Sequence, residues 1–377
     1  MALPTTMQAQ VLNAFNTPYE LTTRPIPPPP TGHDILIRVH AASYCHTDAV
    51  YASGAMGKTL PLVPCHEFAG TVVALGPAVP ASSTLQIGTR VGVPGRAYHP
   101  CGRCKECENT EDESGYSVYC PKAGNNGISR DGGFQQYTLV DARQVVPMPE
   151  ALSFVETAPL MCAGLTVFAA LKRCNLQPGD AVGIVGCGGG LGHLGVQFAL
   201  EMGYRVIGVD NGDAPLRLAR SCVEPDSAAA HIFDARTTDA DAVLASLAES
   251  TGAESLPSER GIPAVLILPE SQAAFSFGMS LLRPHGRCVV VSFPEKGFAF
   301  SAKDLVFKDV EIVGSLVGSN RCAREMLQLA ARSNVRARVR TWSLEALNEL
   351  VEAYKKGEGG KLVVDLEASG LGELSRR

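Results

Sequence analysis

The chain contains 377 residues, 45% of them apolar, a length near that of two typical domains that each bury a core. Its formal charge of -5 arises from mixed acidic and basic residues, without a long basic run that could follow a phosphate backbone. The composition therefore disfavours nucleic-acid binding, and we expect no nucleic-acid partner.

The first ten residues lack the basic start and apolar stretch of a secretion signal, and no uninterrupted apolar segment reaches the ~20 residues that span a bilayer. We expect no membrane partner and a cytoplasmic location. Of the 12 cysteines, four fall between Cys101 and Cys120 at metal-ligand spacing and the others are scattered. This distribution favours a reducing compartment with metal sites over a disulfide framework.

The first third of the chain is predicted to be rich in β-strands. Residues 35–40 alternate apolar and polar side chains, and residues 70–76 form a β-branched run closed by glycines. Pro25 and the four prolines at 27–30 interrupt this region and indicate an extended surface connector.

From about Phe154 short apolar strands alternate with helices. The strand at 181–186 precedes a helix that carries Leu194, Phe198 and Met202 on one face and ends at Gly203. Further strands are predicted at 204–210, 264–268 and 288–291. Alternation of this kind predicts an α/β fold with a parallel, doubly wound Rossmann sheet.

A glycine-rich turn joins the strand at 181–186 to its helix. Glycines have no Cβ, so the backbone can approach phosphates at the helix N-terminus. Asp210 lies 18 residues beyond Gly192, where a carboxylate binds the adenosine ribose and repels a 2′-phosphate. We therefore predict NAD(H) as cofactor, although a glycine turn that serves only tight packing is the alternative. The candidate contacts are Gly186, Gly188, Gly189, Gly190, Leu191, Gly192 and Asp210.

After Phe300 we expect the chain to return to the first domain, because residues 361–366 form a late strand beyond an amphipathic segment at 343–356. The predicted organisation is a β-rich catalytic domain at 1–157, a dinucleotide-binding domain at 158–300 and a return segment at 301–377.

A lobe at 101–120 holds four cysteines. Four thiolates can close a tetrahedral zinc shell and leave no open position, so a zinc bound there would be structural. An iron-sulfur cluster is the minor competitor. The candidate ligands are Cys101, Cys104, Cys107 and Cys120.

Several short motifs occur in the order found in zinc-dependent medium-chain alcohol dehydrogenases, and the chain resembles that family, particularly its microbial branch, almost from end to end. The motifs are Cys-His-Thr-Asp at 45–48, Pro-Cys-His-Glu-Phe-Ala-Gly at 64–70, Cys-Gly-Arg-Cys-Lys-Glu-Cys at 101–107, Asp-Gly-Gly-Phe at 131–134, Ala-Pro-Leu-Met-Cys-Ala-Gly at 158–164 and Gly-Gly-Leu-Gly at 189–192. The resemblance implies a GroES-like catalytic domain beside the Rossmann domain and two Zn²⁺ per chain.

The resemblance also implies a catalytic zinc held by Cys45, His66 and Cys162, which spacing alone does not link. Taken singly, Cys162 is typical of a buried core cysteine and His66 of an ordinary polar residue. Two thiolates and one imidazole leave a fourth position for water or a substrate oxygen, as Lewis-acid catalysis requires.

Further roles follow from the same resemblance. Thr47 would hydrogen-bond the substrate hydroxyl and pass its proton toward the nicotinamide ribose, Asp48 would orient the zinc imidazole, and Glu67 would be able to enter the zinc shell transiently. Further contacts to the cofactor phosphates would come from His46, Arg321 and Lys361. A solvated surface charge is the alternative for each of these basic residues.

Three departures from the family pattern stand out. Cys65 replaces the usual glycine before the ligand histidine, and Val50 replaces the histidine that completes the proton relay. The loop between Cys107 and Cys120 is longer than usual, and the glycine turn has one additional residue.

We expect hydride transfer between an alcohol larger than ethanol and NAD(H), in a homodimer or homotetramer. The only tryptophan, Trp342, lies outside the segments that should line the substrate site, where Met56 and Tyr98 are the candidate walls. A conjugated-alkene reductase of the same superfamily and a non-catalytic, zinc-stabilised nucleotide-binding protein are the alternatives.

Overall fold

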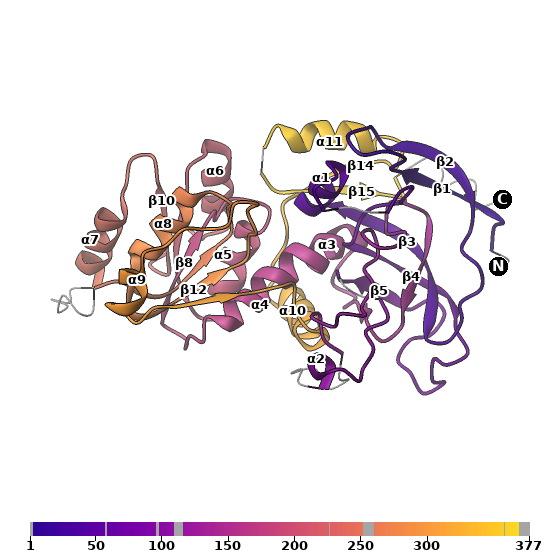
Figure 1. Ribbon diagram of the computed structural model, residues 1–377, viewed down its shortest axis with the longest axis horizontal. Helices are drawn as coiled ribbons and strands as arrows, with labels where there is room; N and C mark the ends of the chain where they lie inside the picture. Colours follow the sequence, from indigo (N-terminus) through magenta and orange to yellow (C-terminus); the bar gives the residue numbers. More distant parts are fainter. Residues whose placement is uncertain are drawn as a thin grey trace. The chain divides into compact units, whose positions relative to one another are not determined.

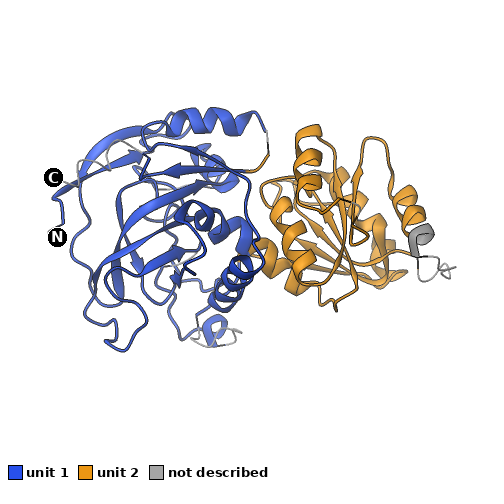
Figure 2. Cartoon of the chain, turned by 180° about the vertical axis from the view of Figure 1, so that it is seen from behind, with its two compact units in different colours: residues 1–165, 318–357, 361–377 blue, residues 166–317, 358–360 orange. Residues whose placement is uncertain are grey.

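The computed structural model describes residues 3–56, 59–95, 98–108, 116–225, 227–251, 260–357 and 359–368. The chain divides into two compact units, shown in Figure 2. Unit 1 comprises residues 1–165, 318–357 and 361–377, and unit 2 comprises residues 166–317 and 358–360.

These boundaries differ from the predicted ones, at 157/158 and 300/301. Residues 158–165 belong to unit 1 because the helix that contains them begins with α3 (Phe154–Pro159), which packs on strands of that unit. Residues 301–317 belong to unit 2 because β13 (Glu311–Gly314) adds a parallel strand to its sheet. The sequence did not reveal this last strand, since it has only four residues and a half-exposed burial pattern.

Unit 2 contains a six-stranded parallel sheet (Figure 1). Its strands, in spatial order, are β10 (Ala230–Asp234), β9 (Arg205–Asp210), β8 (Ala181–Val185), β11 (Ile262–Ile267), β12 (Leu282–Val290) and β13. Its helices are α4 (Leu165–Arg173), whose first residue still belongs to unit 1, α5 (Gly192–Glu201), α6 (Asp213–Ser221), α7 (Ala240–Thr251), α8 (Gln272–Leu281) and α9 (Ala302–Val306). The order reverses beside β8, so the predicted doubly wound Rossmann sheet is confirmed.

Strand β8 shows why these residues form a central strand. All five of its residues, Ala-Val-Gly-Ile-Val, are buried, as is typical of a parallel strand covered on both faces. Helices α5 and α8 both contact it. The carboxyl end of β8 is therefore fixed, and the glycine turn starts from there.

Unit 1 is built around a mixed sheet. Its strands, in spatial order, are β14 (Val339–Trp342), β15 (Lys361–Asp365), β3 (Asp34–Tyr44), β4 (Phe68–Leu75), β5 (Arg90–Val93) and β7 (Val146–Pro147), and β6 (Tyr137–Asp141) also pairs with β3. Strands β1 (Thr6–Val11) and β2 (Glu20–Pro25) form a separate antiparallel pair. The helices described in this unit are α1 (His46–Ala52), α2 (Lys105–Glu108), α3, α10 (Asn320–Arg332) and α11 (Leu347–Lys355), with a π-helix η1 (Leu160–Gly164).

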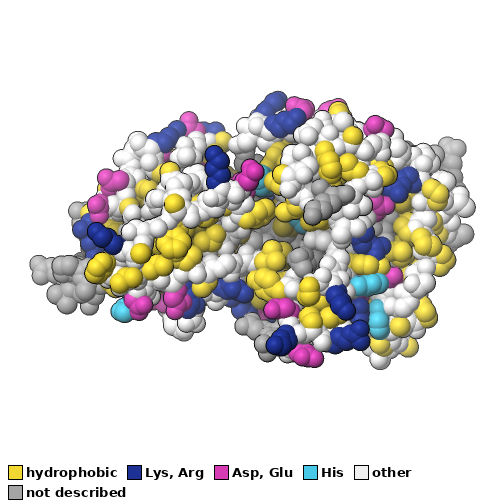
Figure 3. All heavy atoms as spheres, in the orientation of Figure 1, with side chains coloured by type: hydrophobic (Ala, Val, Ile, Leu, Met, Phe, Trp, Pro, Cys, Tyr) yellow, Lys and Arg dark blue, Asp and Glu magenta, His cyan; other side chains and the backbone are white. Residues whose placement is uncertain are grey.

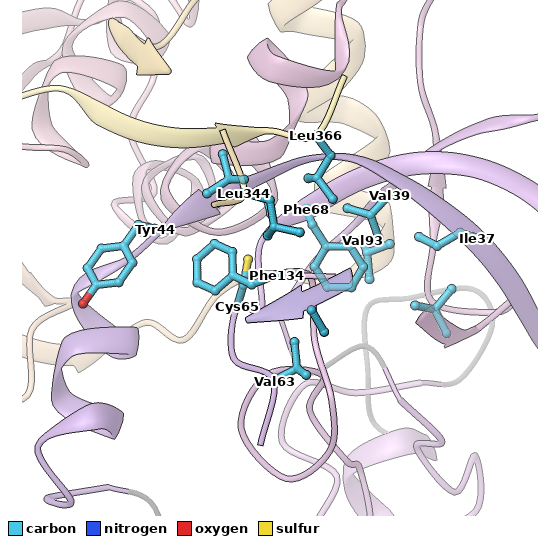
Figure 4. Close-up of a cluster of buried hydrophobic side chains, with 14 of the residues drawn as sticks. Ile37, Val39, Tyr44, Val63, Cys65, Phe68, Val93, Phe134, Leu344 and Leu366 are labelled. Atoms are coloured by element: carbon cyan, nitrogen blue, oxygen red, sulfur yellow. The ribbon is translucent and has the colours of Figure 1, made fainter. Parts of the chain in front are cut away.

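The core of unit 1 joins the early and late parts of the chain. Figure 4 shows Phe68 and Phe134 in its centre, with Leu344 and Leu366 beside them. The late strand β15 pairs antiparallel with the end of β3, so that Leu362 lies opposite Tyr44. In this pairing the late part of the chain lies against a strand of the first third, within unit 1.

One continuous helical segment, Phe154–Arg173, is long and apolar enough to cross a membrane by length and composition. Of its most apolar stretch, 78% is buried inside the protein. The segment is therefore a core helix of this fold.

Candidate metal centres and nucleotide-binding turn

Four side chains of unit 1 converge on one point. One ligand atom from each of Cys45, His66, Glu67 and Cys162 lies within 4.8 Å of all the others. Cys45 Sγ lies 3.9 Å from Cys162 Sγ, and His66 Nε2 lies 3.3 Å from the same sulfur. Ligand atoms of a tetrahedral zinc, with Zn–S of about 2.3 Å and Zn–N of about 2.0 Å, lie about 3.5 to 3.8 Å apart. The residues present therefore fit a zinc ion.

Two neighbouring strands bring the first ligands together. Cys45 directly follows β3, and His66 and Glu67 directly precede β4, which runs antiparallel to β3. The Ser43 backbone N–H donates to the Glu67 carbonyl oxygen at 2.9 Å, which extends the ladder to this end of the sheet. The register of two strands thus places residues about twenty positions apart in one cluster.

The third ligand, Cys162, lies in the π-helix η1. This turn begins after Pro159, and a Cβ at its last residue, Gly164, would come within 2.7 Å of the Leu160 side chain. A π-turn adds a residue to the helix and changes the direction in which the following side chains point, and such turns are frequent at functional sites. The helix itself starts at a capping box formed by Ser153 and Glu156.

Asp48 connects the ligand segments. One of its carboxylate oxygens accepts from Cys45 N at 2.8 Å, and the other accepts from Cys65 N at 3.1 Å. The latter oxygen lies 3.9 Å from His66 Nδ1, too far for a hydrogen bond but close enough for electrostatic orientation of the ring. Asp48 is buried, so it holds both ligand-bearing loops through hydrogen bonds within the protein.

The chemistry of the cluster favours a metal. A hydrogen bond from Cys162, and then the imidazole of His66 and the ammonium of Lys361, hold the pKa of Cys45 well below its ordinary value despite burial. The thiolate is the form that binds zinc. Thr47 Oγ1 lies 3.7 Å from Cys45 Sγ, so the predicted proton-transfer hydroxyl is next to the ligand sphere.

Glu67 forms a buried ion pair that the sequence did not reveal. Lys361 Nζ donates to Glu67 Oε1 at 2.5 Å and to the Tyr44 carbonyl oxygen at 3.3 Å. Lys361 is 5% exposed and Glu67 is fully buried. The structure therefore places Lys361 against Glu67, and a direct phosphate contact by Lys361 would require its ammonium group to leave this pair.

The second cluster is the lobe at 101–120, where one sulfur from each of Cys101, Cys104, Cys107 and Cys120 lies within 4.8 Å of the others. Cys104 Sγ and Cys120 Sγ are 3.9 Å apart, and Cys101 N donates to Cys120 Sγ at 3.3 Å. These four sulfurs fit a closed, four-thiolate zinc shell. Part of the long loop between Cys107 and Cys120, residues 109–115, lies outside the described residues.

Tyr98 does not lie where a wall of the substrate site was expected. Its hydroxyl donates to Asp34 Oδ2 at 3.3 Å, and the guanidinium of Arg130 lies over its ring at 3.5 Å. Asp34 begins β3 whereas Cys45 follows its end, and an eleven-residue strand is roughly 30 Å long. The expectation for Tyr98 is therefore wrong, because its place in the sequence does not show which end of β3 it packs against.

The glycines of the turn in unit 2 are required by close packing of the protein backbone at the start of α5. Gly186 has φ +83°, a Cβ at Gly188 would lie 1.9 Å from Pro215 O, and a Cβ at Gly192 would lie 2.0 Å from Gly186 O. Side chains are thus excluded where the backbone leads into α5, whose N-terminus favours an anion. Asp210 Oδ2 accepts from Gly188 N at 2.9 Å, which brings the predicted ribose acceptor to this turn.

The remaining predicted contacts are divided between the two units, with His46 and Arg321 in unit 1. His46 is the first residue of α1, and Arg321 lies in the first turn of α10. Gly189, Gly190 and Leu191 complete the turn of unit 2 between β8 and α5. Sequence reasoning missed Tyr354, whose hydroxyl lies 2.7 Å from His46 Nδ1, and no motif pointed to it.

Comparisons with known proteins agree with this arrangement. Residues 31–150 match the family model of the alcohol dehydrogenase GroES-like domain, and residues 190–332 match that of the zinc-binding dehydrogenases. An alcohol dehydrogenase of Geobacillus stearothermophilus is 34% identical over 96% of this chain and 100% of its own length. An alcohol dehydrogenase of Moraxella sp. is 34% identical over 95% of this chain and 99% of its own.

Among solved structures, the alcohol dehydrogenase of the archaeon Aeropyrum pernix has a TM-score of 0.79 and 29% identity, and the alignment covers 95% of this chain and 99% of that one. A Rossmann unit, a GroES-like unit and two candidate metal clusters define the class as zinc-binding, nicotinamide-dependent oxidoreductases. Within that class, the chain belongs to the zinc-dependent medium-chain alcohol dehydrogenase family.

Proposed function

We propose that the protein transfers hydride between a primary or secondary alcohol larger than ethanol and NAD(H), with the reverse reduction of the aldehyde or ketone. The observation that carries this proposal is the engagement of Glu67 by Lys361 beside Cys45, His66 and Cys162. With Glu67 held in this way, three protein ligands remain and one coordination position is open to a substrate oxygen.

When bound, zinc supplies Lewis-acid activation of the alcohol oxygen and the nicotinamide accepts the hydride. Cys45, His66 and Cys162 would hold the metal, and Asp48 orients His66 electrostatically. Thr47 Oγ1 lies 3.7 Å from Cys45 Sγ, and it would accept the substrate hydroxyl proton and return it in the reductive direction. Val50 occupies the position of the usual relay histidine, so the proton leaves Thr47 by another route.

The proposed cofactor preference is for NAD over NADP and rests on Asp210. Its carboxylate accepts from the turn at Gly188, where it also opposes a 2′-phosphate. Asp210→Gly should relax the discrimination against NADP by about tenfold or more, because a direct repulsion and a ribose acceptor are both lost. The ratio of kcat/KM values for the two cofactors measures this, and equal use of both by the unaltered protein would refute the assignment.

We propose the substrate size from the packing of two large aromatic side chains, Trp342 and Tyr98. Trp342 packs on the hydrophobic core of unit 1, and Tyr98 lies at the far end of β3. Met56, which follows α1 and is partly exposed, remains a candidate wall. Each methylene that a wider site buries contributes about 0.8 kcal/mol, so efficiency should rise from ethanol to larger alcohols.

A substrate panel tests the function. Ethanol, hexanol, benzyl alcohol and cinnamyl alcohol are each offered with NAD and with NADP, and reduction of the nicotinamide is followed by absorbance. We expect the highest kcat/KM for a larger alcohol with NAD, and a maximum at ethanol would contradict the size proposal. No turnover despite full zinc and tight NADH binding would favour the non-catalytic nucleotide-binding alternative.

The product formed from an α,β-unsaturated aldehyde distinguishes an alcohol dehydrogenase from a conjugated-alkene reductase. An α,β-unsaturated aldehyde should yield the allylic alcohol if the carbonyl is reduced, whereas a saturated aldehyde would indicate alkene reduction. The open position beside Cys45 and Cys162 favours the first outcome.

We also propose a homodimer or homotetramer in the cytoplasm. Large apolar side chains are exposed in unit 2 at Phe293, Phe300, Val306 and Phe307, and Figure 3 shows apolar atoms gathered over this unit. Exposed apolar patches often mark subunit interfaces, and β13 is an edge strand. Sedimentation equilibrium determines the oligomeric state.

The proposed cytoplasmic location is supported by the cysteines. All twelve, which lie in described parts of the chain, are free thiols, as expected in a reducing compartment.

A further inference from the structure

The helix that follows the glycine turn of unit 2 carries a histidine in its first turn. His193 is the second residue of α5 and is fully buried. Its ring nitrogen Nδ1 lies 2.8 Å from the carbonyl oxygen of Gly189, four positions earlier in the chain. A carbonyl oxygen only accepts hydrogen bonds, so Nδ1 carries the hydrogen and donates it. A side chain therefore ties the glycine turn to the start of α5.

The peptide group between Gly189 and Gly190 has few other restraints. In the described part of the chain, a Cβ at Gly189 would meet only Gly186 O, at an ordinary contact distance of 3.5 Å, so close packing does not fix this residue. Glycine on both sides gives a peptide group wide conformational freedom. The backbone N–H of His193 also donates to Gly189 O, at 3.2 Å. The imidazole thus makes the shorter of the two hydrogen bonds that hold this carbonyl.

The direction of this carbonyl determines where the next N–H points. In a trans peptide the C=O and N–H groups point in opposite directions. Because the Gly189 carbonyl points along α5 toward His193, Gly190 N–H points out of the N-terminal end of the helix.

The donors at this end of α5 suit an anion. Within the residues that the structure describes, neither Gly190 N–H nor Leu191 N–H donates to a protein acceptor, and the side chain of Leu191 does not cap the helix. The helix dipole favours negative charge at the same end. A phosphate bound there would accept from these two backbone groups.

We propose that His193 is a positioning residue whose Nδ1–H holds the Gly189 carbonyl oxygen and so keeps Gly190 N–H directed at a phosphate oxygen of the dinucleotide. The inference rests on the proposed function, in which this turn binds NAD(H). Rotation of the peptide group would turn the N–H away from the phosphate and break the imidazole hydrogen bond, so the histidine opposes that rotation. All of these residues belong to unit 2.

A second hydrogen bond of the same kind supplies a control. Gln197 Nε2 donates to the carbonyl oxygen of His193, again four positions earlier, at 2.9 Å. It lies one turn further along α5, so its loss should affect the helix without releasing the Gly189 carbonyl. It also shows that a glutamine in this helix reaches the carbonyl four residues before it. A glutamine at position 193 should therefore replace the imidazole donor.

The test compares His193→Gln with His193→Met. The two side chains are similar in length, but only glutamine can donate to Gly189 O. Gln197→Met removes the corresponding hydrogen bond one turn later and is the matched control. For these three variants and the unaltered protein, calorimetry measures the dissociation constants of ADP-ribose, which contains the pyrophosphate, and of adenosine, which has no phosphate.

We expect His193→Met to weaken ADP-ribose binding about tenfold, the effect of one hydrogen bond, and to leave adenosine binding unchanged. His193→Gln and Gln197→Met should bind ADP-ribose as the unaltered protein does. The KM for NAD should rise in His193→Met with little change in kcat, because the lost contact acts on cofactor binding. If thermal unfolding shows that the methionine variant does not fold, His193→Leu provides the same comparison.

Equal ADP-ribose affinities of His193→Gln and His193→Met would overturn the inference. A loss in Gln197→Met as large as that in His193→Met would show a general effect on α5 and would also overturn it, as would a parallel loss of adenosine binding. The proposed function would survive these results if the unaltered protein binds ADP-ribose and oxidises alcohols with NAD. An unaltered protein that binds no ADP-ribose would contradict both.

Discussion

The two four-ligand clusters of unit 1 differ in how the chain supplies them. The lobe cluster takes its sulfurs from a single stretch, Cys101 to Cys120, and two of its cysteines are partly exposed. The other cluster draws Cys45, His66 and Cys162 from three separate segments and lies in the interior, with its fourth candidate ligand held by Lys361. A local, closed set of thiolates can only stabilise a loop, whereas a buried, incompletely filled set can bind a substrate atom.

The largest expected effect is on catalysis at the interior cluster. Cys162→Ser removes one of three zinc ligands, and we expect turnover to fall at least about a thousandfold, which corresponds to several kcal/mol of lost transition-state stabilisation. Thermal stability should change little by comparison. Cys174→Ser is the control, because that thiol is buried close to the end of the same helical segment and donates to Ala170 O. Near-normal turnover by Cys162→Ser would show that this cluster is not catalytic.

At the lobe we expect a substitution to reduce stability before it reduces turnover. Cys104→Ser should lower the zinc content by one ion and lower the Tm before it lowers turnover per folded molecule, because structural zinc contributes on the order of 10 kcal/mol of binding free energy in small domains. Metal analysis and thermal scans of freshly prepared protein measure both. Unchanged zinc content in this variant would argue against a four-thiolate site.

A fourth protein ligand at the interior cluster would close it in the way that the lobe is closed. In Lys361→Met the carboxylate of Glu67 loses its partner and becomes available as a fourth zinc ligand. We expect retained zinc and turnover lowered by about tenfold to a hundredfold. Because an unpaired buried charge destabilises, the double variant Lys361→Met with Glu67→Gln serves as the control, and it should recover stability and part of the turnover.

The smallest effect concerns Cys65, which has φ +80° and is fully buried. Its thiol donates weakly to the carbonyl oxygens of Ser43 and Glu67. Cys65→Gly and Cys65→Ala both remove the thiol, but only glycine relieves the left-handed backbone, so the glycine variant should be more stable than the alanine variant by about 1 kcal/mol. Urea unfolding compares the two, and the usual order, with alanine more stable, would show that the backbone is not strained.

Features with a local sequence signal could be predicted. The spacing of Cys101, Cys104 and Cys107 indicated the lobe, and the strand, glycine turn and Asp210 indicated the Rossmann unit with its parallel sheet. The interior cluster needed the family resemblance, because strand register and a π-turn bring Cys45 and Cys162 together across 117 positions.

Side-chain contacts between distant segments could not be predicted, because no sequence motif indicates them. Lys361 and Glu67 are 294 positions apart, and Tyr354 and His46 are 308 positions apart. In neither pair does the sequence around one residue identify the other residue as its partner. Tyr98 was misplaced for the same reason, since sequence order does not show which end of β3 a loop reaches. The sequence therefore predicts sites formed by local motifs, but it does not predict contacts that depend on tertiary packing.

The discontinuous layout of unit 1 has a consequence for the nascent chain. Residues 166–317 leave the ribosome as an uninterrupted stretch and can fold as a unit. Strand β3, in contrast, cannot pair with β15 until residues 361–365 have been synthesised. Glu67 and Lys361 are 294 positions apart, so at ~5–20 residues per second the carboxylate is synthesised about 15 to 60 s before its counter-ion. During that interval Glu67 must stay hydrated, and final closure of the interior around the zinc ligands is coupled to the arrival of one of the last strands to be made.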